Sequence, residues 1–268
     1  MTSGINIVVC VKAVPDPKQA CNLKIDPVTK TLLRCDVPMV LNPLDKHALE
    51  AALQIKAENG AHICALSMGP PEAGSIVKEC MALGADKGIL LSDPCFGGAD
   101  AYATAYTLAK GVQKIGDVDA VLCGMASSDG ATEWVGPEMA VMLGMPVVTR
   151  VREIIMGSDE SWEVKAALEN GYRRMRIRLP ALLTVTRDLN APRALSFSGI
   201  IKARKKVITQ WGVDDLGVPA ETVGIKGSPT IVTEMCSVDN TRRVAFLEGT
   251  REEKAEQLLQ KLIEGGVL

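Results

Sequence analysis

Apolar and polar positions follow a regular order along residues 1–150. Short apolar runs rich in β-branched residues stand at 5–11, 62–68, 88–91 and 120–123. Between and after them lie segments with helical spacing, at 44–58, 71–83, 99–115 and 134–143. Continuous apolar strands separated by amphipathic helices are typical of a parallel sheet covered on both faces. The order predicts a Rossmann-like, doubly wound, mostly parallel α/β sheet with a ligand crevice at the carboxyl ends of its strands.

The pattern changes after Thr149. Buried strands are expected at 146–151 and 182–186, and an antiparallel hairpin is expected at 152–156 and 161–168. Basic and apolar residues alternate at 172–179, as they do in an exposed strand. These segments predict an antiparallel hairpin extension of the main sheet.

The C-terminal part of the chain shows little periodicity. From Asp188 to about Val238 no segment has a clear period, and only 251–264 has the pattern of an amphipathic helix. A long stretch without regular structure is unusual inside a compact domain. We therefore divide the chain into an α/β domain at 1–187 and an extended partner-binding arm at 188–268. A flexible tail is the alternative, but it would expose apolar residues such as Phe197 and Ile200 to water.

Composition narrows the function classes. Hydrophobic residues make up 47% of the 268 residues, but aromatic residues make up only 3%, too few for a base-stacking surface. The formal net charge of −2 gives no general attraction for nucleic acid or anionic membranes. No apolar run approaches the roughly 18 residues of a membrane span. The N-terminus also lacks the basic flank and cleavage site of a signal peptide. We expect a cytoplasmic protein that binds neither nucleic acid nor membrane.

Eight cysteines and two histidines give no metal signature. No two cysteines form the Cys-x-x-Cys pair that a structural zinc or iron–sulfur cluster would be expected to show. Cys10, Cys64 and Cys123 fall inside apolar runs, where cysteine packs as a small hydrophobic residue. No nucleophile elbow supports a Ser-His-Asp triad. We expect reduced thiols and no metal ion.

The strongest chemical signal is the loop from Gly124 to Gly136. It follows the fourth apolar run, opens a helix and consists mainly of small and hydroxyl-bearing residues. Small residues let the backbone approach a ligand, and the free N–H groups at a helix N-terminus suit a diphosphate. The loop is neither a GxGxxG motif nor a P-loop. Taken alone, it fits a nucleotide site and an ordinary capped turn equally well.

Other loops fall at the same predicted edge of the sheet, at 9–16, 41–45 and 68–70. Each is compatible with ordinary turn chemistry. Because the carboxyl ends of parallel strands meet at one edge, these loops together favour a shared nucleotide crevice.

These segments together resemble the β subunit of electron-transferring flavoproteins. The motifs are VKAVPD at 11–16, LNPLDKHALEAAL at 41–53, SMGPPEA at 67–73, ALGADKGILLSD at 82–93, the Gly124 loop, LPA at 179–181, DLNAPR at 188–193 and IIKARKK at 200–206. They occur in the family's order and cover nearly the whole chain. The resemblance implies a Rossmann-like domain and an arm that clasps an FAD-bearing α subunit.

The resemblance also implies which residues hold the nucleotide and recognise a partner. It assigns the nucleotide to Cys10, Asn42, Asp45 and Met68, and to the loop residues Gly124, Met125, Ala126, Ser127, Ser128, Asp129, Gly130, Ala131, Thr132, Val135 and Gly136. The segment 194–199 matches the loop that inserts into a partner dehydrogenase, with Phe197 at the position of its apolar anchor and Leu195 beside it. No side chain is required as an acid or base, so we name no catalytic residue.

The family holds either of two nucleotides in this subunit. Members typical of fatty-acid oxidation hold a structural AMP, and bifurcating members hold a second FAD. Val14-Pro15-Asp16 and the Thr132-x-x-Val135-Gly136-Pro137 ending resemble the bifurcating members and favour FAD, with AMP as the alternative. Departures from the usual pattern fall at Met125, Ser127, Ser128 and Trp134. Trp134 is bulky and would either point outward or help to pack the flavin.

With FAD, the resemblance implies electron bifurcation. NADH would be oxidised at this subunit, and electrons would be divided between ferredoxin and the α-subunit FAD, which serves a flavin dehydrogenase of acyl-CoA or 2-hydroxy-acid type. The basic run Lys202 to Lys206 is either a solvated stretch or α-subunit contact, or an attraction for an acidic ferredoxin. A stress protein of the same nucleotide-binding superfamily is a third alternative, but it would lack the arm from Asp188 onward.

Overall fold

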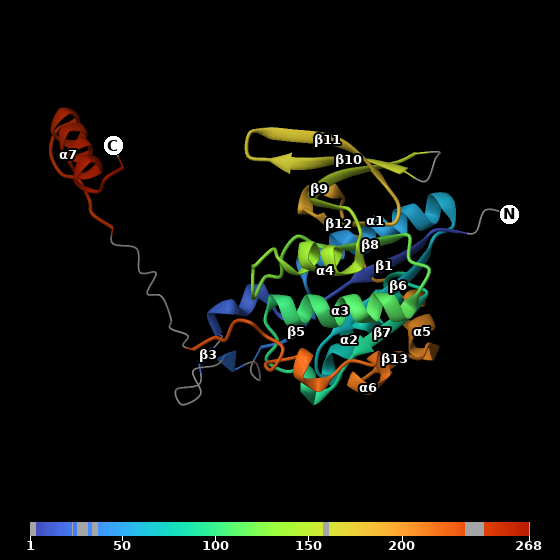
Figure 1. Cartoon of the computed structure of the whole chain (residues 1–268). Coiled ribbons are helices and arrows are strands. Elements are labelled where there is room, and N and C mark those ends of the chain that lie inside the picture. Colours follow the sequence, from blue (N-terminus) through green and yellow to red (C-terminus); the bar gives the residue numbers. More distant parts are fainter. Residues whose placement is uncertain are drawn as a thin grey trace.

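The computed structural model describes residues 4–22, 24–25, 32–33, 37–157, 161–233 and 244–267. Its centre is a nine-stranded sheet in the order β11-β10-β9-β12-β8-β1-β6-β7-β13 (Figure 1). The strands of this sheet are β1 (Asn6–Cys10), β6 (His62–Met68), β7 (Lys87–Leu91), β8 (Ala120–Gly124), β9 (Val147–Met156), β10 (Ser161–Leu168), β11 (Gly171–Arg178), β12 (Ala181–Val185) and β13 (Thr209–Trp211). The predicted α/β class with a mostly parallel sheet is confirmed.

The parallel strands reverse their order between β1 and β8. From β1 the chain proceeds outward through β6 and β7, and it then returns to place β8 on the other side of β1. The register aligns Val9 with Leu122 of β8 and Cys10 with Leu66 of β6. Such a reversal separates the connections above and below the sheet and opens a crevice at the carboxyl ends of the strands. The reversal of strand order therefore lies between β1 and β8, the position where doubly wound folds bind their ligands.

Four helices cover the two faces of the sheet. Side chains of α1 (Pro43–Asn59) and part of α2 (Gly74–Leu83) share one hydrophobic cluster, whereas α3 (Ala101–Ile115) and α4 (Val135–Leu143) pack into a second cluster on the opposite face (Figure 1). Local signals set the ends of these helices. Pro43 begins α1, the left-handed Gly60 ends it, and the Asp100 side chain caps α3 by accepting from Ala103 N.

Shorter elements surround this framework. Two small antiparallel sheets pair β2 (Ala13–Pro15) with β5 (Met39–Leu41), and β3 (Lys24–Ile25) with β4 (Leu32–Leu33). Single turns of 3₁₀ helix occur at Pro71–Ala73, Pro94–Phe96, Arg187–Leu189 and Ala220–Thr222, and a longer 3₁₀ segment with a kink at Gln19 occurs at Pro17–Asn22. The first of the small sheets connects the end of β1 to the start of α1, so it brings two predicted site loops together.

The antiparallel extension consists of β9, β10 and β11. The strands expected separately at 146–151 and 152–156 are one continuous strand, β9, which is parallel to β12 and antiparallel to β10. Trp162, Val164 and Ile177 are buried in the cluster that α1 also enters, so one face of the extension packs on the body. The basic edge strand β11 leaves most of its arginines exposed, as the alternating sequence predicts.

Residues 188–233 hold more regular structure than the sequence pattern predicts. They contain α5 (Phe197–Lys205), β13 and the short α6 (Val213–Leu216), so the expectation of no regular element there is wrong. β13 pairs with β7 and forms one edge of the main sheet. α5 lies against α2, where a Cβ on Gly199 would come within 2.2 Å of Ala82 O. The division at 187/188 stays a prediction, and part of the second segment packs on the α/β domain.

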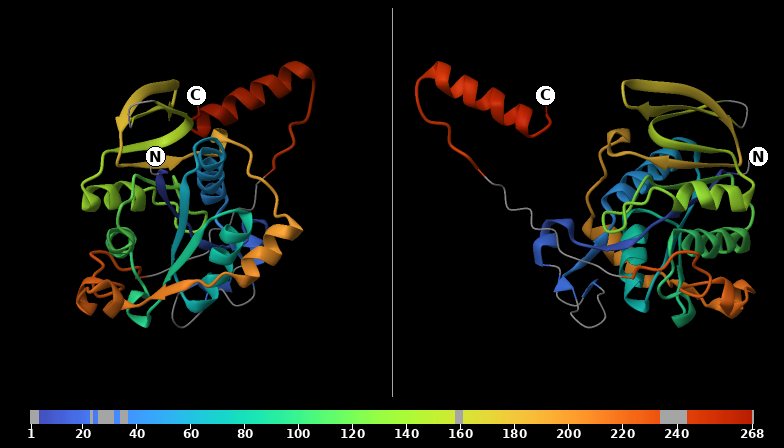
Figure 2. Two further views of the ribbon diagram at one scale, coloured as in Figure 1. Left: turned by 90° about the vertical axis from the view of Figure 1, so that its right-hand side faces the viewer. Right: turned by 60° about the vertical axis from the view of Figure 1, so that its left-hand side comes forward.

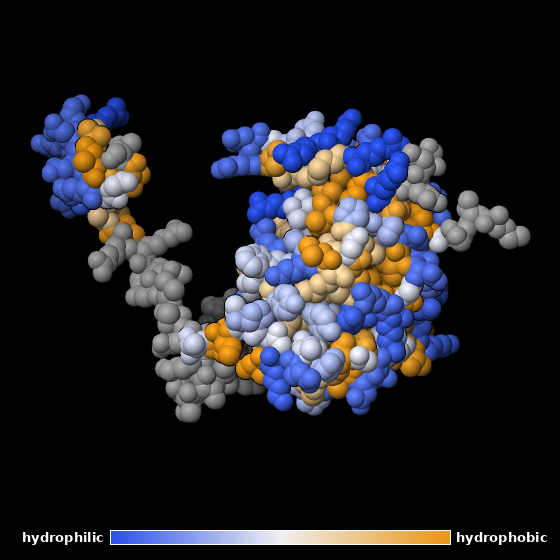
Figure 3. Space-filling model, viewed as in Figure 1, coloured by the Kyte–Doolittle hydropathy of each residue, from blue (hydrophilic) through white to orange (hydrophobic). Residues whose placement is uncertain are grey.

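The final helix stands apart from the body. α7 (Arg251–Glu264) begins with Thr250 and Glu253 in a capping box, and the two further views show it projecting away from the sheet (Figure 2). Its apolar side chains Leu258, Leu259 and Ile263 are about half exposed. The helix surface shows a hydrophobic patch beside hydrophilic residues (Figure 3). The predicted amphipathic helix is thus confirmed. Among the described residues, no helix combines the length and apolar character needed to cross a membrane.

Candidate functional site

The site residues expected from the sequence come from neighbouring elements at one edge of the sheet. Cys10, Met68 and Gly124 are the last residues of β1, β6 and β8, which lie side by side. Asn42 and Asp45 come from the start of α1. The order reversal between β1 and β8 therefore gathers segments that are far apart in the sequence, as the parallel pattern predicts.

Asp45 joins three of these segments. Its Oδ2 accepts a hydrogen bond from Lys12 N at 2.8 Å, and its Oδ1 accepts one from Gly124 N at 3.0 Å. A Cβ on Gly124 would lie 2.5 Å from Asp45 Oδ1 and 2.7 Å from Leu44 Cβ, so only glycine allows this close approach. Asp45 is 5% exposed, and burial raises its pKa to about 6 although the hydrogen bonds from Asn42, Lys12 and Gly124 oppose the shift.

Asn42 holds the first half of the Gly124 loop. Its Nδ2 donates to Ala126 O at 3.0 Å, and its Oδ1 accepts from Ser128 N at 3.2 Å. Its backbone N donates to Lys12 O at 2.9 Å. Because Asn42 is 1% exposed, these bonds are sheltered from water. Asn42 and Asp45 act mainly on the protein backbone, and this fixes the shape of the loop.

The second half of the loop has unusual backbone geometry. Ala131 and Glu133 both have positive φ, at 49° and 60°, although neither is glycine. Arg150, with φ of 56°, donates to Glu133 Oε2 from Nη2 at 2.8 Å and from Nε at 3.1 Å. A Cβ on Gly136 would lie 2.6 Å from Thr184 Cγ2, so the start of α4 packs closely on β12. The loop is thus tied to β9 and packed on β12.

The loop retains donors that a phosphate could use. In the described part of the chain, the backbone N–H groups of Ser127, Thr132, Val135 and Gly136 have no protein acceptor. The last two belong to the first turn of α4, where the helix dipole favours an anion. Unsatisfied amides beside small side chains fit a phosphate-bearing nucleotide. The 65% exposure of Trp134 shows that its indole points away from the core.

Cys10 is buried at the end of β1. Burial, reinforced by the nearby Cys123 and Asp45, raises the pKa of the Cys10 thiol well above its usual value. Cys10 and Met68 belong to the cluster on the α3–α4 face. A neutral, buried thiol is suited to packing rather than to nucleophilic chemistry. The five cysteines whose side chains are described are all free.

Two residues of this site were not among the expected contacts. Lys12 Nζ lies 2.7 Å from Asp129 Oδ1 and 3.4 Å from Ser127 Oγ. Arg150 holds Glu133, as described above. A lysine directly after an apolar strand is a signal that could have identified Lys12. No comparable signal marks Arg150, because its partner lies 17 residues earlier and depends on the loop geometry.

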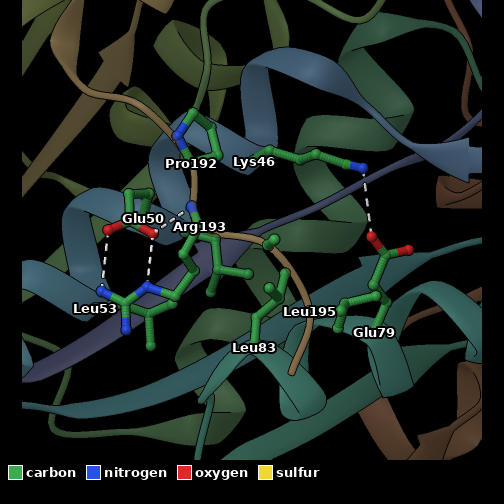
Figure 4. Close-up of a pocket in the computed structure, with 10 residues that line it drawn as sticks. Lys46, Glu50, Leu53, Glu79, Leu83, Pro192, Arg193 and Leu195 are labelled. Carbon is green, nitrogen blue, oxygen red and sulfur yellow. Dashed lines mark hydrogen bonds and ion pairs between the residues drawn. The ribbon is translucent and has the colours of Figure 1, made fainter. Parts of the chain in front are cut away.

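The expected partner-recognition residues lie on a separate surface over α1 and α2. Phe197 is 80% exposed at the start of α5, and Leu195 is 43% exposed. Arg193 anchors this segment through bonds of 2.8 and 2.9 Å from Nε and Nη2 to Glu50, which is buried on α1 (Figure 4). Leu195 lines two cavities, of about 140 and 310 Å³. Phe197 is therefore presented outward from a segment that is fixed at its base.

The basic run near this surface forms the end of α5. Lys202, Arg204 and Lys205 lie in its last turn, where cations stabilise the helix dipole. Lys206 Nζ donates to Ala85 O at 2.8 Å, and Lys78 Nζ donates to Ala203 O at 3.0 Å. Part of the run thus has a structural role within this chain.

Comparison with known proteins identifies the family. A family model described as the electron transfer flavoprotein domain matches residues 29–216. The chain belongs to the electron transfer flavoprotein family. The β subunit of the Clostridium acetobutylicum electron transfer flavoprotein is 41% identical to this family member, over 97% of this chain and 98% of its own length. The predicted resemblance to β subunits is confirmed.

Two other relatives of this electron transfer flavoprotein chain are named for larger assemblies. CarD, a subunit of the caffeyl-CoA reductase–Etf complex of Acetobacterium woodii, is 43% identical over 98% of this chain and 100% of its own length. The acryloyl-CoA reductase electron transfer subunit gamma of Anaerotignum propionicum is 35% identical, again over 98% and 100%.

Proposed function

We propose that this chain is the FAD-binding β subunit of a bifurcating electron transfer flavoprotein in the cytoplasm. In this role it accepts hydride from NADH and divides the electrons between ferredoxin and the FAD of an α subunit that serves a flavin dehydrogenase. The flavin would supply the redox chemistry, and the protein would supply binding, orientation and electrostatics. The observation that carries the proposal is the Gly124 loop, which hydrogen bonds with Asn42 and Asp45 fix at the reversal of strand order.

The residues proposed to hold the nucleotide divide by role. Ser127, Thr132, Val135 and Gly136 offer amides or hydroxyls to its phosphates, and Cys10 and Met68 form an apolar wall. Asn42 and Asp45 position the loop through backbone bonds. We expect the mainly small side chains of the loop to admit a group larger than AMP, and we expect the 65% exposed Trp134 side chain to point outward. These features favour FAD, and an AMP-binding β subunit is the alternative.

The proposed partner is an acyl-CoA-type flavin dehydrogenase. Two relatives carry the names of caffeyl-CoA and acryloyl-CoA reductase assemblies, and both align along nearly the whole chain. The exposed Phe197 on its anchored segment supplies an apolar contact for such an enzyme. A dehydrogenase of 2-hydroxy-acid type is the alternative partner.

Nucleotide content tests the proposal most directly. The chain is co-expressed with its α subunit, purified and denatured, and the released nucleotides are identified by mass. Two FAD per heterodimer, and bleaching of the flavin absorbance by NADH, are the expected results. One FAD and one AMP would contradict the FAD assignment and support the alternative. Ferredoxin reduction by NADH only in the presence of the dehydrogenase and its CoA-ester substrate would then support bifurcation.

A further inference from the structure

Lys12 has a backbone that hydrogen bonds hold in place and a side chain that extends to the Gly124 loop. Its N donates to Asp45 and its carbonyl accepts from Asn42, so the main chain at Lys12 belongs to the rigid part of the site. Its side chain is 43% exposed and extends to the Gly124 loop, where Nζ meets Asp129 Oδ1 at 2.7 Å and Ser127 Oγ at 3.4 Å. A lysine head group with three donors thus stands beside the turn 127–130.

Two ion pairs between described residues involve side chains of the loop. In the described ranges, the cations that bond to loop side chains are Lys12 and Arg150. Arg150 forms an ion pair with Glu133 at the end of the loop nearer to α4. Lys12 forms an ion pair with Asp129 in the turn that also contains the free backbone amide of Ser127. The Asp129 side chain is only 10% exposed, so most of it is shielded from water.

A phosphate at this loop would change the balance of these charges. An anion bound by the free amides would lie close to Asp129 and be repelled by it, but it would be attracted to Lys12. A phosphate offers a lysine ammonium several acceptor oxygens with more negative charge than one carboxylate. The Lys12–Asp129 pair is part of a site that nucleotide binding would open.

We propose that Lys12 exchanges partners: it binds the Asp129 carboxylate in the nucleotide-free protein and a phosphate of the nucleotide in the loaded protein. Asp129 then weakens nucleotide binding instead of supporting it. The inference rests on the proposed nucleotide site but holds equally for FAD and for AMP, because both carry the phosphate. It predicts that Lys12 supports nucleotide binding and that Asp129, which the resemblance assigns to the binding set, opposes it.

The experiment measures dissociation constants on the complex of this chain with its α subunit after the nucleotide has been removed. The ligands are FAD, AMP and adenosine, which lacks phosphate. Lys12→Met is expected to weaken binding of the phosphate-bearing ligand at least about tenfold and to leave adenosine within about twofold. Asp129→Asn is expected to tighten binding of the same ligand several-fold. Raising the salt concentration should weaken binding to the unmodified complex more than to Lys12→Met.

The ion pair between Lys165 and Glu153 on the β9–β10 hairpin supplies matched controls. Lys165→Met and Glu153→Gln make the same charge changes away from the loop, so nucleotide affinity should stay unchanged. If Lys12→Met binds FAD and AMP as tightly as the unmodified complex, or weakens adenosine equally, the partner exchange is wrong. Weaker binding by Asp129→Asn would also overturn it, because Asp129 would then be a supporting residue.

The affinities of the unmodified complex separate this inference from the proposed function. If the unmodified complex binds AMP tightly but not FAD, the FAD assignment fails. The ratio of the AMP dissociation constants of Lys12→Met and the unmodified complex then still tests the role of Lys12. If the unmodified complex binds neither nucleotide, both the nucleotide site and the partner exchange are refuted.

Discussion

The buried carboxylate of Asp45 makes the stability of this protein depend on pH in an unusual direction. Burial raises its pKa from 3.8 to about 6 in the folded protein. Between these two values the folded protein holds a proton that the unfolded chain has released. The free energy of unfolding therefore falls as the pH rises from about 4 to about 6, the reverse of the ordinary behaviour of paired carboxylates.

The size of the effect follows from the shift. A difference of about two pKa units corresponds to about 3 kcal/mol of stability. Asp45→Asn removes the ionisable group, so its stability should lack this component. The absolute stability of Asp45→Asn also changes, because the NH2 group that replaces one carboxylate oxygen cannot accept the hydrogen bond from Lys12 N or Gly124 N. The contribution of Asp45 ionisation is therefore measured by how the difference in unfolding free energy between the two proteins changes with pH.

Urea denaturation at a fixed protein concentration, followed by circular dichroism between pH 4 and pH 7, measures this difference. The stability of the unmodified protein should fall by about 3 kcal/mol relative to Asp45→Asn over that range. Asp86→Asn is the control, and its stability difference from the unmodified protein should stay nearly flat between pH 4 and pH 7. Burial opposes ionisation of Asp86, but hydrogen bonds from Lys56 and Ile63 outweigh it and hold its pKa below 3.8. The Asp86 contribution is thus present above pH 3.8 and is lost as the pH falls below that value.

A flat difference between the unmodified protein and Asp45→Asn from pH 4 to pH 7 would refute the reasoning. It would mean that Asp45 is hydrated, or that its acceptor bonds compensate burial fully. A falling difference that is also seen with Asp86→Asn would indicate a general effect of removing a carboxylate instead.

Three other substitutions test the site and the docking segment. Gly136→Ala puts a methyl group 2.6 Å from Thr184 Cγ2, so it should lower stability by about 1–3 kcal/mol and reduce the nucleotide retained through purification. Glu50→Gln removes the charge that holds Arg193 and should cost about 1–3 kcal/mol of stability in denaturation, with normal nucleotide content. Phe197→Ala should weaken electron transfer to the dehydrogenase and leave NADH oxidation by an artificial acceptor intact, and an equal loss of both activities would show a structural role.

The sequence pattern predicts the elements that pack into the two large hydrophobic clusters on the faces of the sheet. A strand such as β6, with five consecutive buried residues, is recognisable in the sequence as a continuous apolar run because both of its faces are covered. α5 was missed because Ala203 is its only buried residue, so no apolar stripe marks it. β13 has three residues and gains its place only by pairing with β7. Such elements depend on tertiary neighbours that local sequence does not contain.

The same limit applies within the site. The strand-end positions of Cys10 and Gly124 follow from topology, because parallel strands present their carboxyl ends at one edge. The bond from Lys12 to Asp129 joins residues 117 positions apart, so the local pattern gives no access to it. Positive φ at Glu133 and Arg150 is equally hidden, since only glycine and a few polar residues signal that conformation.

The connection from β12 to β13 sets how this protein can be engineered. It leaves the interior of the sheet, crosses α1 and α2 where Glu50 and Lys78 hold it, and rejoins the sheet at the far edge. Phe197 therefore lies on a connection whose two ends are strands of the same sheet. Residues inserted into this connection would loosen the docking surface. The tight turn at 169–170 only connects β10 to β11 and does not belong to the β12–β13 connection. A fluorophore or an affinity tag belongs at that turn, where extra residues change neither the β12–β13 connection nor the crevice.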